Sequence, residues 1–179
     1  MKRYADDYET IIEMDERGRE KKVAVYRGRY FNIDIQGKEL IRFRRNSLIL
    51  IIAIIILHVV GGFVDNPGMY AFFVALPYVM IFLPLYFMIA GGLRLPGENK
   101  KFRRDEIGLS FERIRKSNRF ALILLGVVLL GEVVFLIWFA GGEVLQEVMF
   151  MAVELLALIG AYVLYRLQRS MNTKIGEGE

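Results

Sequence analysis

The chain has 179 residues, of which 55% are hydrophobic, and 24 Lys and Arg against 20 Asp and Glu give it a formal net charge of +4. Hydrophobic content this high, gathered in long blocks, excludes an ordinary soluble domain. We expect the positive charge to contact anionic lipid headgroups and not nucleic acid. The chain has no cysteine, which excludes disulfides, thiolate metal sites and cysteine nucleophiles.

Residues 1–46 are predicted to form a small cytoplasmic β-hairpin or meander, of two or three strands, that leads into the first long helix. Segments 8–14, 22–26 and 29–35 are rich in β-formers, and 15–18 carries turn residues between the first two. A meander of this size cannot bury enough apolar surface to be stable alone. We therefore expect it to pack on the membrane-proximal helices, on a second copy or on a partner.

Four long apolar runs follow. At 1.5 Å per residue, each can cross a hydrocarbon core of about 30 Å as a helix. The sequence therefore predicts an all-α integral membrane protein built as an antiparallel four-helix transmembrane bundle over residues 47–165. The four runs are 47–64, 69–92, 120–140 and 144–165.

The basic residues predict the orientation of this bundle. Twelve Lys and Arg precede the first run, nine lie between the second and third, and three follow the fourth. The connectors 65–68 and 141–143 contain none. The positive-inside rule then places both termini, the loop 93–119 and the tail 166–179 in the cytoplasm. We expect the membrane to be a prokaryotic plasma membrane.

The loop 93–119 combines basic residues with one apolar helical face. Arg103 and Arg104 belong to a basic cluster of the kind found at lipid headgroups. Apolar side chains then recur at i, i+4 and i+7, which indicates an amphipathic helix. It can lie on the membrane surface, extend the third membrane helix or dock a partner. The apolar face consists of Ile107, Phe111 and Ile114.

Ionisable residues inside the apolar runs form the candidate site. Such groups are costly in a bilayer and usually face the protein interior or water. Three interpretations stay open: a cation or proton site open to the outside, hydrogen bonds that fix helix packing, and interface residues that reach water. All the candidates fall in the outer half of the predicted bundle. They are His58, Glu132, Glu147 and Glu154.

The second run contains Pro77 and Pro84, which lie seven residues apart and therefore on nearly the same helix face. Each proline removes a backbone donor and can bend the helix. Such positions often line a cavity or contact another helix, since the freed carbonyl needs a partner. A static kink is the alternative.

The functional prediction is a non-enzymatic accessory or interaction subunit of a membrane complex, as a homo-oligomer or within a larger assembly. The soluble mass is predicted on one side of the membrane, and the sequence contains no Walker loop, GxSxG or HExxH motif. No cofactor or resident metal is expected. The alternative is a small transporter or channel for a cation or cationic solute that uses the Glu and His side chains.

Overall fold

Four long helices dominate the computed structural model, which describes residues 2–14, 19–33, 37–97, 102–139, 144–172 and 175–177. A short helix, α3 (Arg104–Ile107), precedes the third of them, so the numbering of the long helices has a gap. The long helices are α1 (Gly37–Gly61), α2 (Phe72–Gly92), α4 (Arg113–Trp138) and α5 (Val144–Asn172).

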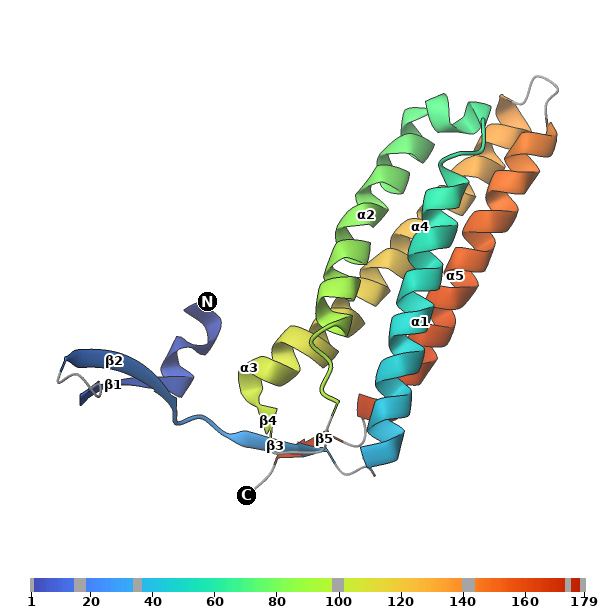
Figure 1. Ribbon diagram of the computed structural model, residues 1–179. Helices are drawn as coiled ribbons and strands as arrows, with labels where there is room; N and C mark the ends of the chain where they lie inside the picture. The colour runs from blue at the N-terminus through green and yellow to red at the C-terminus, as the bar shows by residue number, and fades with distance from the viewer. Residues whose placement is uncertain are drawn as a thin grey trace.

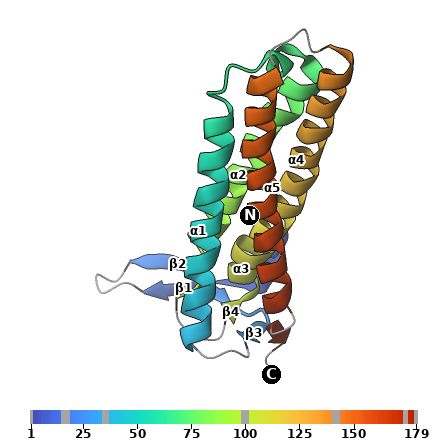
Figure 2. The ribbon, with the colours of Figure 1, turned by 90° about the vertical axis from the view of Figure 1, so that its right-hand side faces the viewer.

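The long helices run up and down in one bundle (Figure 1). Helix α1 packs against α2 and α5, and α4 packs against the same two helices. Figure 2 shows α1 and α5 side by side along the bundle. At one end a short helix, η2 (Pro67–Tyr70), joins α1 to α2. The N-terminal elements and the last strand lie at the opposite end (Figure 1).

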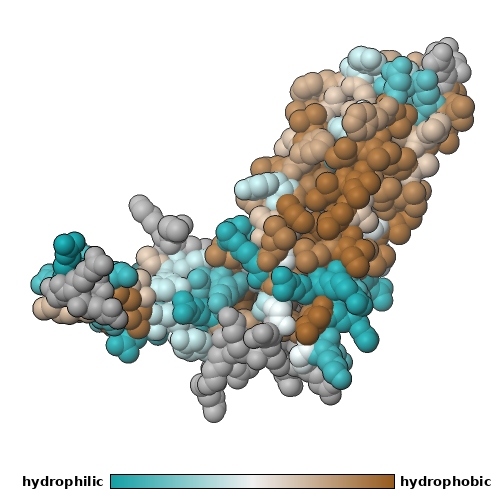
Figure 3. Space-filling view, viewed as in Figure 1, coloured by the Kyte–Doolittle hydropathy of each residue, from teal (hydrophilic) through white to brown (hydrophobic). Residues whose placement is uncertain are grey.

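Within the described residues, four helices are long and apolar enough to cross a membrane, which suggests a membrane protein. Many large apolar side chains on the outside of the bundle are exposed, such as Leu83, Leu130 and Leu156. In Figure 3 the bundle surface is hydrophobic along most of its length and becomes hydrophilic at the end that carries the strands. An apolar outer surface of this extent fits lipid better than water.

The boundaries of the helices differ from those of the predicted runs by several residues. Helix α1 starts ten residues before Ser47, and α5 continues seven residues past Tyr165.

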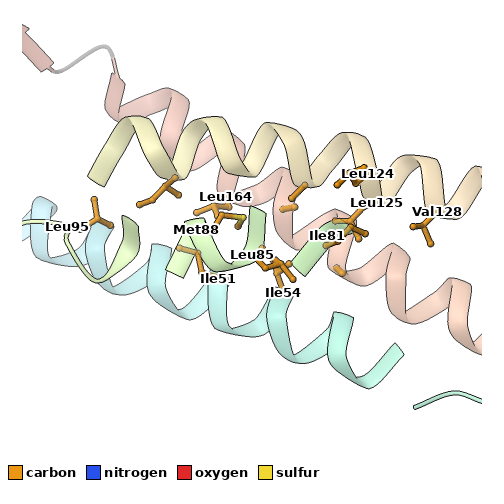
Figure 4. Packing of buried hydrophobic residues seen from close by; sticks show 14 of the residues in the cluster. Ile51, Ile54, Ile81, Leu85, Met88, Leu95, Leu124, Leu125, Val128 and Leu164 are labelled. Carbon is orange, nitrogen blue, oxygen red and sulfur yellow. The ribbon is translucent and has the colours of Figure 1, made fainter. Parts of the chain in front are cut away.

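The interior of the bundle is filled by interlocking aliphatic side chains (Figure 4). Each helix contributes fully buried residues, for example Ile54, Ile81 and Leu125.

Of the two predicted alternatives, two or three strands, the structure has the two-stranded hairpin. Strand β1 (Tyr8–Met14) pairs antiparallel with β2 (Glu20–Tyr26) as a two-stranded sheet. The third strand, β3 (Tyr30–Ile33), instead lies between β4 (Phe102–Arg103) and β5 (Ile175–Glu177) in a separate sheet. The predicted turn at 15–18 lies outside the described residues.

A close approach at Gly28 separates the two sheets. A Cβ atom at this position would lie 2.6 Å from the hydroxyl oxygen of Tyr26 and 2.9 Å from Cβ of Asp7. The chain can turn there only because glycine has no side chain. The turn directs β3 away from the hairpin and toward β4 and β5. Local sequence patterns do not predict pairing with segments so far along the chain.

The middle loop continues the third membrane helix. Helix α3 (Arg104–Ile107) passes through one π-helical segment, η3 (Gly108–Glu112), into α4. The apolar span candidate is accordingly the whole of Arg104–Trp138. Of the alternatives for this segment, the structure therefore has the extension of the third helix and not a separate helix on the membrane surface.

Candidate functional site: two buried polar pairs

The first buried pair joins α1 to α5. Nδ1 of His58 lies 3.1 Å from Oε1 and 3.2 Å from Oε2 of Glu154, and neither side chain has any exposed surface. The other ring nitrogen, Nε2, lies 3.2 Å from the backbone carbonyl oxygen of Tyr78. The Tyr78 hydroxyl donates a 2.6 Å hydrogen bond back to the carbonyl of His58.

These contacts define how many protons the first pair holds. A carbonyl only accepts, so Nε2 of His58 must carry a proton. One further proton then lies between Nδ1 and the Glu154 carboxylate, on either partner. In both arrangements the pair carries no net charge, which suits a fully buried site. Every polar atom of this pair has a complementary partner.

The second pair lies where α4, α5 and η2 meet. Asn66 donates through Nδ2 to Oε1 of Glu132 at 2.8 Å. The backbone N–H of Gly68 donates to Oε1 of Glu147 at 2.9 Å and to Oδ1 of Asn66 at 2.7 Å. The connector between α1 and α2 thus folds onto the end of the bundle and supplies the donors for both carboxyl groups.

The second pair lacks one donor. The Glu132 and Glu147 carboxyl groups lie within hydrogen-bonding range of each other. Their Oε2 atoms are nevertheless both buried without a donor among the described residues. Two carboxylates have no donor to offer each other, but a proton bound by either carboxyl group supplies one. The geometry therefore calls for at least one bound proton.

The structure brings the four predicted site residues into two clusters and not into one. Each of the four side chains is at most 1% exposed. Glu147 and Glu154 are seven residues apart on α5, which corresponds to about 10 Å along the helix. Both clusters lie in the interior of the bundle, so none of the four side chains has more than a trace of exposed surface.

Sequence reasoning missed the contribution of Asn66 and Gly68. Asn66 precedes Pro67, and this local signal predicts a turn with a side chain that bonds its own backbone. The Asn66 side chain does accept from the Gly68 amide in this way. Its amide group also reaches Glu132, which is 66 residues away, and no local signal indicates that contact.

The two prolines of α2 are buried at its packed face. Pro77 has no N–H, so the carbonyl of Phe73 has no helical partner. This carbonyl faces α4, because a Cβ atom built on Gly131 would lie 3.3 Å from the Phe73 oxygen. Pro77 thus marks a close α2–α4 contact next to Glu132, and Pro84 lies on the same buried face.

The predicted docking face is covered by the chain itself. Ile107 and Ile114 are buried, and the ring of Phe111 stacks on that of Phe43 at 5.8 Å. The basic neighbours behave differently. Arg103 and Arg104 remain exposed, and the guanidinium of Arg103 lies 5.6 Å from the centre of the Tyr26 ring.

The root of the β1–β2 hairpin is attached to α3 by tyrosine side chains. The Tyr8 hydroxyl donates to Oδ2 of Asp105 at 2.9 Å, and the backbone N–H of Arg104 donates to the Tyr26 hydroxyl at 3.0 Å. Burial, followed by the hydrogen bond to Asp105, raises the pKa of Tyr8 above its ordinary value. The phenol therefore stays protonated and remains a donor at neutral pH.

Among the described residues, no group of three or more His, Cys, Asp or Glu side chains is arranged to hold a metal ion. No known protein family, curated protein or solved structure matches this chain. Its function is therefore argued from its own residues.

Proposed function

We propose that the protein is a non-enzymatic interaction subunit of a membrane complex, anchored by four transmembrane helices. The observation that carries this proposal is the β1–β2 hairpin, which projects sideways from one end of the bundle (Figure 1). Of its fourteen strand residues, only Tyr26 is buried. A two-stranded hairpin is at best marginally stable by itself in water, so a partner surface is expected to cover it.

The apolar residues near the tip of the hairpin support a contact with protein. Ile12 is 62% exposed and Met14 is 74% exposed, whereas the tyrosines at the root pack on one another. The hairpin also offers the outer edges of both strands for pairing with an added strand. The partner we infer is a cytoplasmic segment of another subunit in the same membrane.

The proposal can be tested by the size of the complex in mild detergent. The native protein should migrate as an assembly larger than its own 20.7 kDa chain plus micelle. Ile12→Ser/Met14→Ser should reduce the assembly to the single chain, while Ile41→Ser, at an exposed site of α1, should not. An unchanged assembly in the double variant, or a native protein that is already a single chain, would overturn the proposal.

The orientation that goes with this function has both termini and the hairpin in the cytoplasm of a prokaryote. The hydrophilic end of the bundle carries most of the basic residues, as the positive-inside rule requires of a cytoplasmic face. Since the native chain has no thiol, single cysteines report on it directly. Asp65→Cys should react with an impermeant reagent in intact cells and Lys21→Cys should not; the opposite pattern would reverse the orientation.

A second candidate function is the transport of protons or cations, and the donor missing between Glu132 and Glu147 favours it. A buried carboxyl pair that needs a proton is a plausible relay point in a membrane. Proton flux into proteoliposomes should then be lost in Glu132→Gln and in Glu147→Gln. Gly126→Ala, at a position with open space, should leave it intact. Flux that persists in both glutamine variants would exclude this candidate.

A further inference from the structure

A cavity of about 760 Å³ lies between the end of the bundle and the strands that cover it. Its walls come from distant parts of the chain: the segment after β2, the start of α1, the continuous helix α3–η3–α4, and the end of α5. The volume is within the range of about 300–1,000 Å³ that is usual for small-molecule sites. Neither of the buried polar pairs contributes to it.

Counted from the spans predicted from the sequence, the cavity lies at the depth of lipid headgroups. Its apolar wall includes Phe43, Ile114 and Phe111. Phe43 precedes the predicted first span by four residues, and Ile114 precedes the third by six, which corresponds to about 6 and 9 Å along each helix. The headgroup layer occupies roughly the same distance on each side of the hydrocarbon core.

The lining of the cavity is basic. Four arginines face two carboxylates there, which leaves a formal charge of +2. Guanidinium groups bind phosphate oxygens through paired hydrogen bonds, so this is the usual side chain of phosphate sites. The arginines are Arg27, Arg29, Arg104 and Arg115, and the carboxylates are Asp7 and Glu112.

Gln168 provides an independent indication of a ligand. Its side chain lines the cavity and is only 6% exposed, yet neither its Nε2 nor its Oε1 atom has a hydrogen-bond partner among the described residues. A buried amide with both atoms unpaired is costly. Asp7 adds an acceptor on the same lining, since its buried Oδ2 atom also lacks a partner within the part of the chain that the structure describes.

We propose that this cavity binds the headgroup of an anionic phospholipid. The phosphate would contact the arginines and the amide group of Gln168. A hydroxyl of the headgroup would donate to Oε1 of Gln168 or to Oδ2 of Asp7, which only a ligand with donors can satisfy. The acyl chains would leave along Phe43 and Ile114 toward the hydrocarbon core. A soluble phosphate compound offers the same phosphate chemistry, but the apolar wall and the headgroup depth favour the lipid.

The test measures lipid binding to the whole chain in detergent by native mass spectrometry. Phosphatidylglycerol should bind at least tenfold more tightly than phosphatidylcholine. Gln168→Leu and, separately, Arg115→Gln should each weaken phosphatidylglycerol binding at least fivefold. Arg45→Gln removes the same charge from an exposed site outside the cavity and should change binding less than twofold.

Gln168→Leu keeps the charge and approximate volume of the side chain, so helix content by circular dichroism should stay that of the native protein. If the helix content of Gln168→Leu differs from that of the native protein, lipid binding is compared with Gln168→Asn, which keeps a polar side chain. Equal weakening by Arg45→Gln, or no preference for phosphatidylglycerol, would overturn the proposal. Binding of glycerol 3-phosphate as tight as that of the lipid would overturn the lipid assignment and transfer the phosphate site to a soluble ligand.

Discussion

The two buried pairs of the bundle differ in how their polar atoms find hydrogen-bond partners. His58 and Glu154 are chemically complementary, so their shared proton leaves a neutral pair with every polar atom satisfied. Glu132 and Glu147 are both acceptors, and they depend on the amides of Asn66 and Gly68 and on a proton from solvent. The first pair can serve as a fixed link between helices, whereas the second can change its protonation. Stability and transport should therefore respond differently at the two sites.

The largest effect is expected from removal of one member of the first pair. His58→Leu leaves the Glu154 carboxyl buried without its partner, and we expect a loss of about 3–5 kcal/mol in the free energy of unfolding. His58→Leu/Glu154→Leu removes both polar groups and should recover most of that loss. Reversible unfolding by SDS in mixed micelles measures both values. Equal losses in the single and double variants would show that the two side chains are not coupled.

The next largest loss of stability is expected in the connector whose backbone N–H donates to the second pair. A Cβ atom on Gly68 would lie 2.5 Å from Oε2 and 2.8 Å from Oε1 of Glu132. Gly68→Ala should therefore displace the connector or the carboxyl group and cost about 1–3 kcal/mol. Gly126→Ala is the matched control, because among the described residues no atom outside the local backbone of α4 lies within 4 Å of the added Cβ. A cost for Gly68→Ala no larger than that of the control would contradict the packing described for η2.

A smaller loss of stability is expected at Glu132. Its Gln and Leu variants distinguish the need for a hydrogen-bond donor from the need for a carboxylate charge. In Glu132→Gln the new amide can keep the bond from Asn66 and donate to Oε2 of Glu147, so unfolding should change by less than about 1 kcal/mol. Glu132→Leu leaves the buried Asn66 amide without its acceptor and should cost about 1–3 kcal/mol. The same SDS titration compares the two. A glutamine variant as unstable as the leucine variant would argue against a proton shared by the carboxyl groups.

The smallest effect is expected outside the bundle, at the hairpin root. Tyr8→Phe removes the hydrogen bond to Asp105 and should cost about 0.5–1.5 kcal/mol. Because the pKa of Tyr8 is raised in the folded protein, this contribution should be fully present below pH 10 and decline only as the pH rises above that value. Amide exchange of the β1–β2 hairpin at pH 7 and 9 measures it. A difference between native and variant that shrinks between these two pH values would contradict the assignment.

The sequence was sufficient for features that depend on local composition. Long apolar runs predicted the four candidate spans because a bilayer requires the backbone to satisfy its own hydrogen bonds over about 20 residues. The β-formers around Ile11 and Val23 likewise predicted the two paired strands. The same reasoning left the position of β3 open, since the choice between adding to a hairpin and pairing with Phe102 is made by contacts between distant segments.

The sequence by itself thus determined which segments are apolar, where the buried ionisable groups lie along each helix, and that they had to be partnered. Only the tertiary structure decided the partners. Helical periodicity fixes the face on which Glu132 or Glu154 lies, but it carries no information about which residue of another helix lies opposite. That choice depends on the packing of α1, α4 and α5 and on the connector that brings Asn66 to the end of the bundle. The basic cavity depends on packing in the same way, because its lining is assembled from segments that are separated by up to about 160 residues.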